Sequence, residues 1–89
     1  MKSSVHFTEL ERREIGIVEP EIFISYSLFS AYKDNKIYFI SAESSNDCSM
    51  AIVGSSREQA EKIFRLLVEG KVTPCTLKDC VDDFLASEL

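Results

Sequence analysis

Three carboxylates near the end of the chain, Asp79, Asp82 and Asp83, form its densest cluster of residues that could do chemistry. Such a group could hold a divalent metal or act as an acid and base. If the segment is helical, neighbouring residues point about 100° apart, so Asp82 and Asp83 cannot both face one small cavity. Asp79 and Asp83 can share a face, but Mg²⁺ and Ca²⁺ sites use more than two oxygen ligands. The pattern favours a solvated acidic face, or secondly a surface that docks a partner.

Thiol chemistry would depend on Cys48, Cys75 and Cys80, with His6 as the single histidine. The four residues could form a Cys₃His zinc site, but their spacing matches no zinc motif. A catalytic cysteine needs a base, and His6 lies in the least regular part of the sequence. Cys80 falls on an apolar stripe, where cysteine acts as a small hydrophobe. We therefore predict no metal, cofactor or catalytic residue, and the reactivity of the three thiols stays open.

Nucleotide and nucleic-acid chemistry is disfavoured by the residues present. With three glycines the chain has no Gly-rich phosphate loop, and its serines do not form a nucleophile elbow. A stacking platform for single-stranded nucleic acid would use Phe23, Phe29, Tyr38 and Phe39. Such a platform needs a positively charged groove, and Lys33 with Lys36 is the only basic pair nearby. Packing in a core or an interface explains these aromatics better.

Length, composition and charge limit the classes of protein to which this chain can belong. The 89 residues suffice for one domain, 1–89, and 45% of them are hydrophobic, which suits a folded chain. Ten basic against fifteen acidic residues give a net charge of -5, which argues against a nucleic-acid partner. No apolar run is long enough for a membrane span, and the start resembles no secretory signal. An odd number of cysteines without Cys-x-x-Cys also fits the cytoplasm, where we expect the protein.

The first half of the chain reads as strands. In residues 21–33, large apolar side chains alternate with smaller or polar ones, and a turn at 33–36 leads to a second strand over 37–42. A shorter apolar run over 48–53 predicts a third strand, ended by Gly54. Residues 1–18 are ambiguous, because the charged run 9–14 fits an edge strand, a short helix or a partly disordered segment.

Two amphipathic helices are predicted after Gly54. Ser55 and Glu58 match a capping box, and Gly70 stands where a left-handed glycine would close the first helix. Thr76 can cap the second helix, and the preceding Pro74 keeps the two helices apart. Their apolar stripes recur at helical spacing: Ala60, Ile63, Phe64, Leu67 and Val68, then Leu77, Cys80, Val81, Phe84 and Leu85.

The segment from Ser55 to Leu85 also resembles a family of small uncharacterised proteins from Firmicutes, mostly Clostridia and their relatives. The shared features are a serine-capped helix, the pair Thr73-Pro74, and a closing motif like L-x-D-V-V-x-D-F/Y-L. The resemblance covers roughly residues 25–85. Phe39 replaces a glycine that is common in the family, and Cys80 replaces an aliphatic residue. The resemblance implies a bacterial, intracellular protein of unknown function and brings no activity, cofactor or catalytic residue.

The predicted architecture is α+β: an antiparallel sheet of three to four strands followed by two C-terminal helices on one face. Two short helices leave the other sheet face or an edge strand uncovered, so we predict a homodimer through that surface. The favoured function is a non-catalytic module that binds or regulates an unidentified protein partner. The alternative is an enzyme or small-ligand-binding protein with a pocket between sheet and helices.

Overall fold

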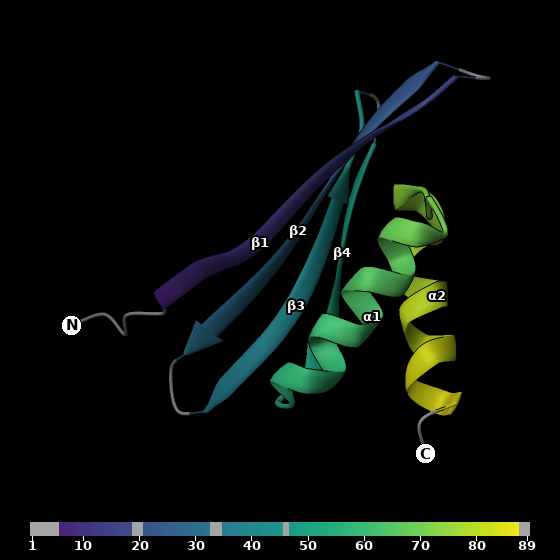
Figure 1. The fold of residues 1–89 in the computed structure, drawn as a ribbon. Helices are drawn as coiled ribbons and strands as arrows, with labels where there is room; N and C mark the ends of the chain where they lie inside the picture. The colour runs from purple at the N-terminus through teal and green to yellow at the C-terminus, as the bar shows by residue number, and fades with distance from the viewer. Residues whose placement is uncertain (1–5, 19–20, 33–34, 46, 88–89) are drawn as a thin grey trace.

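Four strands come first and two helices follow, so the predicted α+β class is confirmed (Figure 1). The computed structural model describes residues 6–18, 21–32, 35–45 and 47–87. The first two residues of the predicted turn at 33–36 therefore lie outside the described residues. The elements are β1 (His6–Ile17), β2 (Ile22–Tyr32), β3 (Lys36–Glu43), β4 (Cys48–Gly54), α1 (Arg57–Glu69) and α2 (Pro74–Ser87).

The sheet is an antiparallel meander in the order β1-β2-β3-β4. In the centre of the sheet, Tyr26 pairs with Ala42 and Leu28 pairs with Ile40. The outer strands each contain an irregularity, in β1 between Glu9 and Glu11 and in the pairing of β3 with β4. Because each strand joins its neighbour in sequence, the sheet has two open edges, formed by β1 and β4.

Strand β1 settles the ambiguity of the charged run in favour of the edge strand. Residues 9–14 pair with β2 along almost their whole length, except at the irregularity. The run can be this polar because a strand at the edge of a sheet has one side in water, and charged residues there discourage pairing with another chain. Residues 1–5, the start of this ambiguous region, lie outside the described residues.

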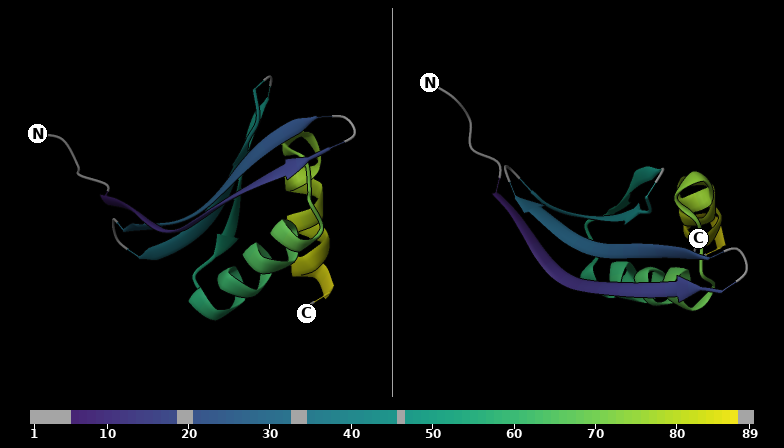
Figure 2. Two further views of the ribbon diagram at one scale, coloured as in Figure 1. Left: turned by 45° about the horizontal axis from the view of Figure 1, so that its top comes forward. Right: turned by 90° about the horizontal axis from the view of Figure 1, so that it is seen from above.

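Both helices cover the same face of the sheet and leave the opposite face open (Figure 2). Ile24, Tyr26 and Leu28 of β2 point toward the helices and are almost completely buried. Phe64 of α1 is 2% exposed, and Phe84 of α2 is half-buried against the core. The remaining core members from the helices are Ala60, Ile63, Leu67, Leu77 and Val81. The predicted apolar stripes are therefore the surfaces that pack on the sheet.

The start of α1 differs from the prediction by one residue. The helix begins at Arg57, and the N-cap is Ser56, whose Oγ accepts a hydrogen bond from the backbone N of Gln59 at 3.2 Å. Ser55 lies one position too early to reach the first free N–H groups. Ser56 and Gln59 satisfy the same capping pattern as Ser55 and Glu58, because glutamine can replace glutamate in it.

The end of α1 also corrects the prediction, because Gly70 is not left-handed. Its φ is −82°, whereas Lys71 has a φ of 52°. Lys71 N donates to Val68 O at 3.1 Å, and Val72 N donates to Leu67 O at 3.2 Å. These two bonds define a Schellman motif in which Lys71 occupies the position that glycine usually takes.

Helix α2 begins at Pro74, two residues before the predicted cap Thr76. Proline suits the first position of a helix because its missing N–H would have no helical partner there. Thr73 precedes it, and Thr73 O accepts a hydrogen bond from Thr76 N at 3.1 Å. Thr76 therefore belongs to the first turn of α2 and does not cap it.

Candidate functional site

The face of the sheet opposite the helices carries a continuous apolar patch. It runs across all four strands, because the register places Phe7 beside Ala31, Phe29 beside Phe39, and Phe39 beside Ile52. We define the open-face patch as Phe7, Phe29, Ala31, Ile37, Phe39, Met50 and Ile52. Its most exposed members are Ile52 at 68%, Phe7 at 64%, Met50 at 58% and Ile37 at 41%.

Three aromatic rings give the patch a fixed centre. Phe29 and Phe39 stack with their ring centroids 5.3 Å apart and their planes at 16°. Phe7 meets Phe39 edge to face at 5.8 Å and 85°. Phe39 is consequently only 6% exposed although it lies on the open face. Packed rings of this kind hold one another in place, so the patch is a formed surface with little rotamer freedom to lose on binding.

Because of the irregularity in β1, this strand places apolar side chains on both faces of the sheet. Before it, Phe7 lies on the open face; after it, Ile15 and Ile17 pack against the core on the helix side. A strand of strict period two would carry these odd-numbered residues on one face. The extra residue at Leu10 changes the phase, so that Arg12 and Glu14 follow Phe7 on the open face.

Apart from one residue at the rim of the patch, the charged residues of the open face lie farther along the strands than the aromatic rings. Arg12 Nη2 lies 3.2 Å from Glu14 Oε2, and both side chains are exposed. Ser25, beside Glu14 in the register, is followed across the sheet by Glu43. Glu9, beside Phe29, is the charged residue at the rim of the patch. The open face is thus divided into an apolar end and a polar end.

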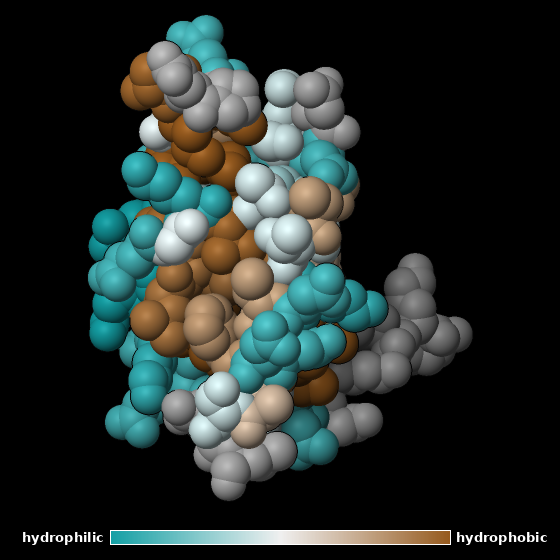
Figure 3. Space-filling view, turned by 90° about the vertical axis from the view of Figure 1, so that its right-hand side faces the viewer, coloured by the Kyte–Doolittle hydropathy of each residue, from teal (hydrophilic) through white to brown (hydrophobic). Residues whose placement is uncertain are grey.

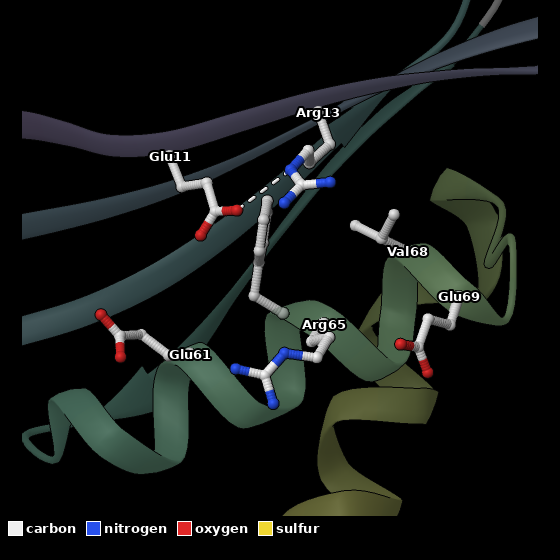
Figure 4. A pocket seen from close by; sticks show the side chains of 7 residues that line it. Glu11, Arg13, Glu61, Arg65, Val68 and Glu69 are labelled. Atoms are coloured by element: carbon white, nitrogen blue, oxygen red, sulfur yellow. Dashed lines mark hydrogen bonds and ion pairs between the residues drawn. The ribbon is translucent and has the colours of Figure 1, made fainter.

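A charged hollow lies on the other side of the sheet, between β1 and α1 (Figure 4). Its volume is about 410 Å³, and it is lined by Glu11, Arg13, Glu61, Phe64, Arg65, Val68 and Glu69. Arg13 Nε lies 3.0 Å from Glu11 Oε2, and Glu61 pairs at 3.0 Å with Arg57, which is not a lining residue. This hollow occupies the place where the sequence suggested a pocket between sheet and helices.

The side that carries the helices shows an apolar band between polar flanks (Figure 3). Leu66 of α1 is the large apolar side chain most exposed on the two helices, at 38%. Phe84 and Leu85 of α2 are half-buried and contact the core. Apolar surface on this side is therefore largely the outer margin of the core, unlike the separate patch on the open face.

The residues that sequence analysis singled out for chemistry are not brought together. Asp79, Asp82 and Asp83 are all exposed on α2, and within residues 6–18, 21–32, 35–45 and 47–87 no three His, Cys, Asp or Glu side chains group as metal ligands. The thiols lie on separate elements: Cys48 and Cys75 are exposed, and Cys80 is half-buried on the apolar stripe where it was predicted. The His6 side chain lies outside the described part.

The aromatics considered as a stacking platform are also separated. Phe29 and Phe39 belong to the open-face patch, whereas Tyr38 faces the helices and is buried. Phe23 lies at the polar end of the open face, where its ring covers Gly16 on the neighbouring strand. Lys36 Nζ lies 6.0 Å from the centre of the Tyr38 ring, and Lys33 lies outside the described residues.

Sequence reasoning did not identify the open-face patch as a site, although it recognised that one sheet face would stay uncovered. The available signal was the apolar character of both alternating sets in the last two strands. Ile37 and Phe39 alternate with buried Tyr38 and Ile40, and Ile52 alternates with buried Ala51. Strands with two apolar faces need cover on both.

These features define a small α+β domain with a four-stranded meander, two covering helices and an uncovered apolar sheet face. Residues 17–87 match the model of the family of unknown function DUF6514, and the chain belongs to that family. Membership of a family of unknown function is thus confirmed. No curated protein and no solved structure matches the chain. Among the described residues, neither helix combines the length and apolarity needed to cross a membrane.

Proposed function

We propose that this chain is a protein-binding domain that works without catalysis, and that the open-face patch is its binding surface. The observation that supports this most is the collection of large apolar side chains on one uncovered face, around stacked Phe29 and Phe39. Contiguous apolar patches of a few hundred Å² on a small domain commonly mark interaction sites. Aromatic residues and methionine, both present here, are enriched in protein interfaces.

The proposal includes a regulatory or scaffolding role in the cytoplasm of a bacterium of the Firmicutes type. Cys48 and Cys75 are exposed and form no disulfide bond, which supports a reducing compartment, where free thiols persist. The taxonomic part rests on the resemblance of residues 25–85 to a clostridial family.

The alternative, a small-ligand-binding protein or enzyme, would use the hollow between β1 and α1. Its location supports this reading, but its chemistry supports it less. Five of the seven lining side chains are charged. Pockets for small organic ligands are mostly apolar with a few placed polar groups, and they enclose most of the ligand.

The test compares binding by three forms of the full chain. We expect affinity purification from the source organism to recover a protein that the wild type and Val18→Asp retain and that Ile52→Asp loses. Val18 is a matched control because it is 85% exposed, follows directly after the far end of β1, and receives the same new charge. The partner must then bind in stoichiometric amount when both proteins are purified. Equal retention by Ile52→Asp would refute the open-face patch as the surface.

A further inference from the structure

We infer that the occupant of the open-face patch is the same patch of a second copy of this chain. Two sheets would pack face to face about a two-fold axis near Phe39, with the helices on the outside. This inference rests on the proposed function, because it names the partner of the same surface. A sandwich of two antiparallel sheets about 10 Å apart is an ordinary way to cover two apolar sheet faces.

The size of the patch is what a dimer of this kind needs. Taking roughly 200 Å² for a fully exposed large side chain, the exposed fractions of Phe7, Ile37, Met50 and Ile52 leave about 450 Å² of apolar surface. One side of a standard interface buries about 800 Å², of which some 55–65% is apolar. The patch therefore supplies about the apolar area that one partner contributes.

Most of the charge on the open face lies outside the patch. In an interface about a two-fold axis, the same surface of both copies meets, so a patch with charge of one sign would repel its copy. The stacked Phe29 and Phe39 carry no charge, Arg12, Glu14 and Glu43 lie farther along the face, and Glu9 beside Phe29 is the one charge at the rim. A two-fold axis near Phe39 superposes the apolar ends and carries the two polar ends in opposite directions.

An alternative dimer would pair the β4 strands edge to edge. This edge has features that permit it, since Cys48–Gly54 contains no charged residue and no proline, whereas β1 carries charges. Edge pairing would leave Phe7 and Ile37 exposed, because they lie on β1 and β3 away from that edge. Face-to-face packing covers the exposed residues of all four strands at once, and for this reason we favour it.

The net charge of the chain lets salt dependence distinguish a second copy from a basic partner as the occupant of the patch. Each chain has a formal net charge of -5, so two copies repel at long range. Salt screens that repulsion, and the dimer should become tighter as the salt concentration rises. A basic partner would behave in the opposite way, because salt would weaken its attraction to the acidic chain.

The experiment measures the molar mass of the full chain by sedimentation velocity and light scattering, from micromolar to millimolar concentration, at low and high salt. We expect a monomer–dimer equilibrium that shifts toward the dimer at high salt. Phe7→Asp and Ile52→Asp should each raise the dissociation constant about 100-fold or more, because both copies bury the new charge. Val18→Asp should leave it nearly unchanged. Circular dichroism and thermal unfolding confirm that each variant is folded.

A milder variant keeps the test valid if the aspartates unfold the sheet. Ile52→Thr retains a β-branched residue suited to a strand and removes apolar contact, and we expect about a 10-fold weaker dimer. Loss of the dimer in Ile52→Asp but not in Phe7→Asp would show edge pairing through β4 and overturn the inference. A wild type that stays monomeric at every concentration and salt would also overturn it.

The experiments distinguish failure of the dimer from failure of the proposed function. If the wild type is monomeric but binds a different protein through Ile52, the proposed function stands and only the second copy is excluded. If it is monomeric and Ile52→Asp changes no binding, both fail.

Discussion

The hydroxyl of Tyr26 donates a hydrogen bond to the backbone carbonyl of Val72 at a distance of 2.5 Å. Tyr26 lies in the middle of the sheet and is completely buried, and Val72 lies between the two helices. The bond therefore ties the connection between α1 and α2 to the sheet. It also gives the single polar atom of a buried side chain a partner, which a phenol in a core requires.

Removing this hydroxyl should destabilise the fold. We expect Tyr26→Phe to lower the free energy of unfolding by about 1–2 kcal/mol, because the Val72 carbonyl loses its donor in a partly buried place. Tyr32→Phe is the matched control, since Tyr32 is 54% exposed and should tolerate the change within about 0.5 kcal/mol. Urea denaturation followed by circular dichroism measures both. Equal stability of the two variants would contradict the role given to the bond.

The same residue makes stability depend on pH in the alkaline range. Burial raises the pKa of Tyr26 from 10.0 to about 12. Between these values the unfolded chain has released the phenol proton and the folded chain has kept it, so stability falls as pH rises. The total loss is on the order of 2–3 kcal/mol. Denaturation curves across this range should show the advantage of the wild type over Tyr26→Phe shrinking, whereas a constant difference would contradict the prediction.

The end of α1 offers a stabilising substitution. Lys71 has a φ of 52°, a conformation that costs a residue with a Cβ atom about 1 kcal/mol or more relative to glycine. We expect Lys71→Gly to raise the free energy of unfolding by about 1 kcal/mol. Lys71→Ala is the control, because it removes the same side chain and charge but keeps Cβ, and it should have little effect. A gain in both variants would assign the effect to the lysine side chain instead.

The extent to which this fold was predictable follows from how local each signal is. Strands β2 and β3 are specified by alternation that can be read within each segment, and so are the apolar stripes of α1 and α2. The helix ends were misplaced by one or two residues because adjacent residues satisfy the same pattern. Ser55 and Ser56 each stand three residues before a glutamate or glutamine, so both fit a capping box. The left-handed conformation was predicted for Gly70 because glycine usually adopts it, but Lys71 has it.

The open-face patch was only partly predictable, because register and irregularities are long-range properties. That one face stays uncovered could be predicted, because two short helices can cover only one face of a sheet. The approach of Phe29 to Phe39 depends on the pairing of β2 with β3, and the position of Phe7 depends on the change of phase at Leu10. Neither the register nor the irregularity has a signature within its own segment, so the members of the patch could not be assigned from the sequence.

The three cysteines should differ in reactivity according to their exposure. Cys48 and Cys75 are exposed, whereas Cys80 is half-buried against the core. We expect a short pulse of iodoacetamide under native conditions to modify Cys48 and Cys75 well before Cys80, with sites identified by mass spectrometry. All three should react equally in denaturant. Fast native modification of Cys80 would contradict its packing on the stripe of α2.

The two serines before α1 provide a test of the helix start that changes only one hydroxyl at a time. Ser56 Oγ accepts the hydrogen bond from Gln59 N, so Ser56→Ala leaves that N–H without its partner and should cost about 1 kcal/mol. Ser55→Ala should change stability by less than about 0.5 kcal/mol, because Ser55 lies outside the cap. Denaturation under identical conditions compares the two variants. A larger loss in Ser55→Ala would place the cap at Ser55, and α1 would then begin one residue earlier.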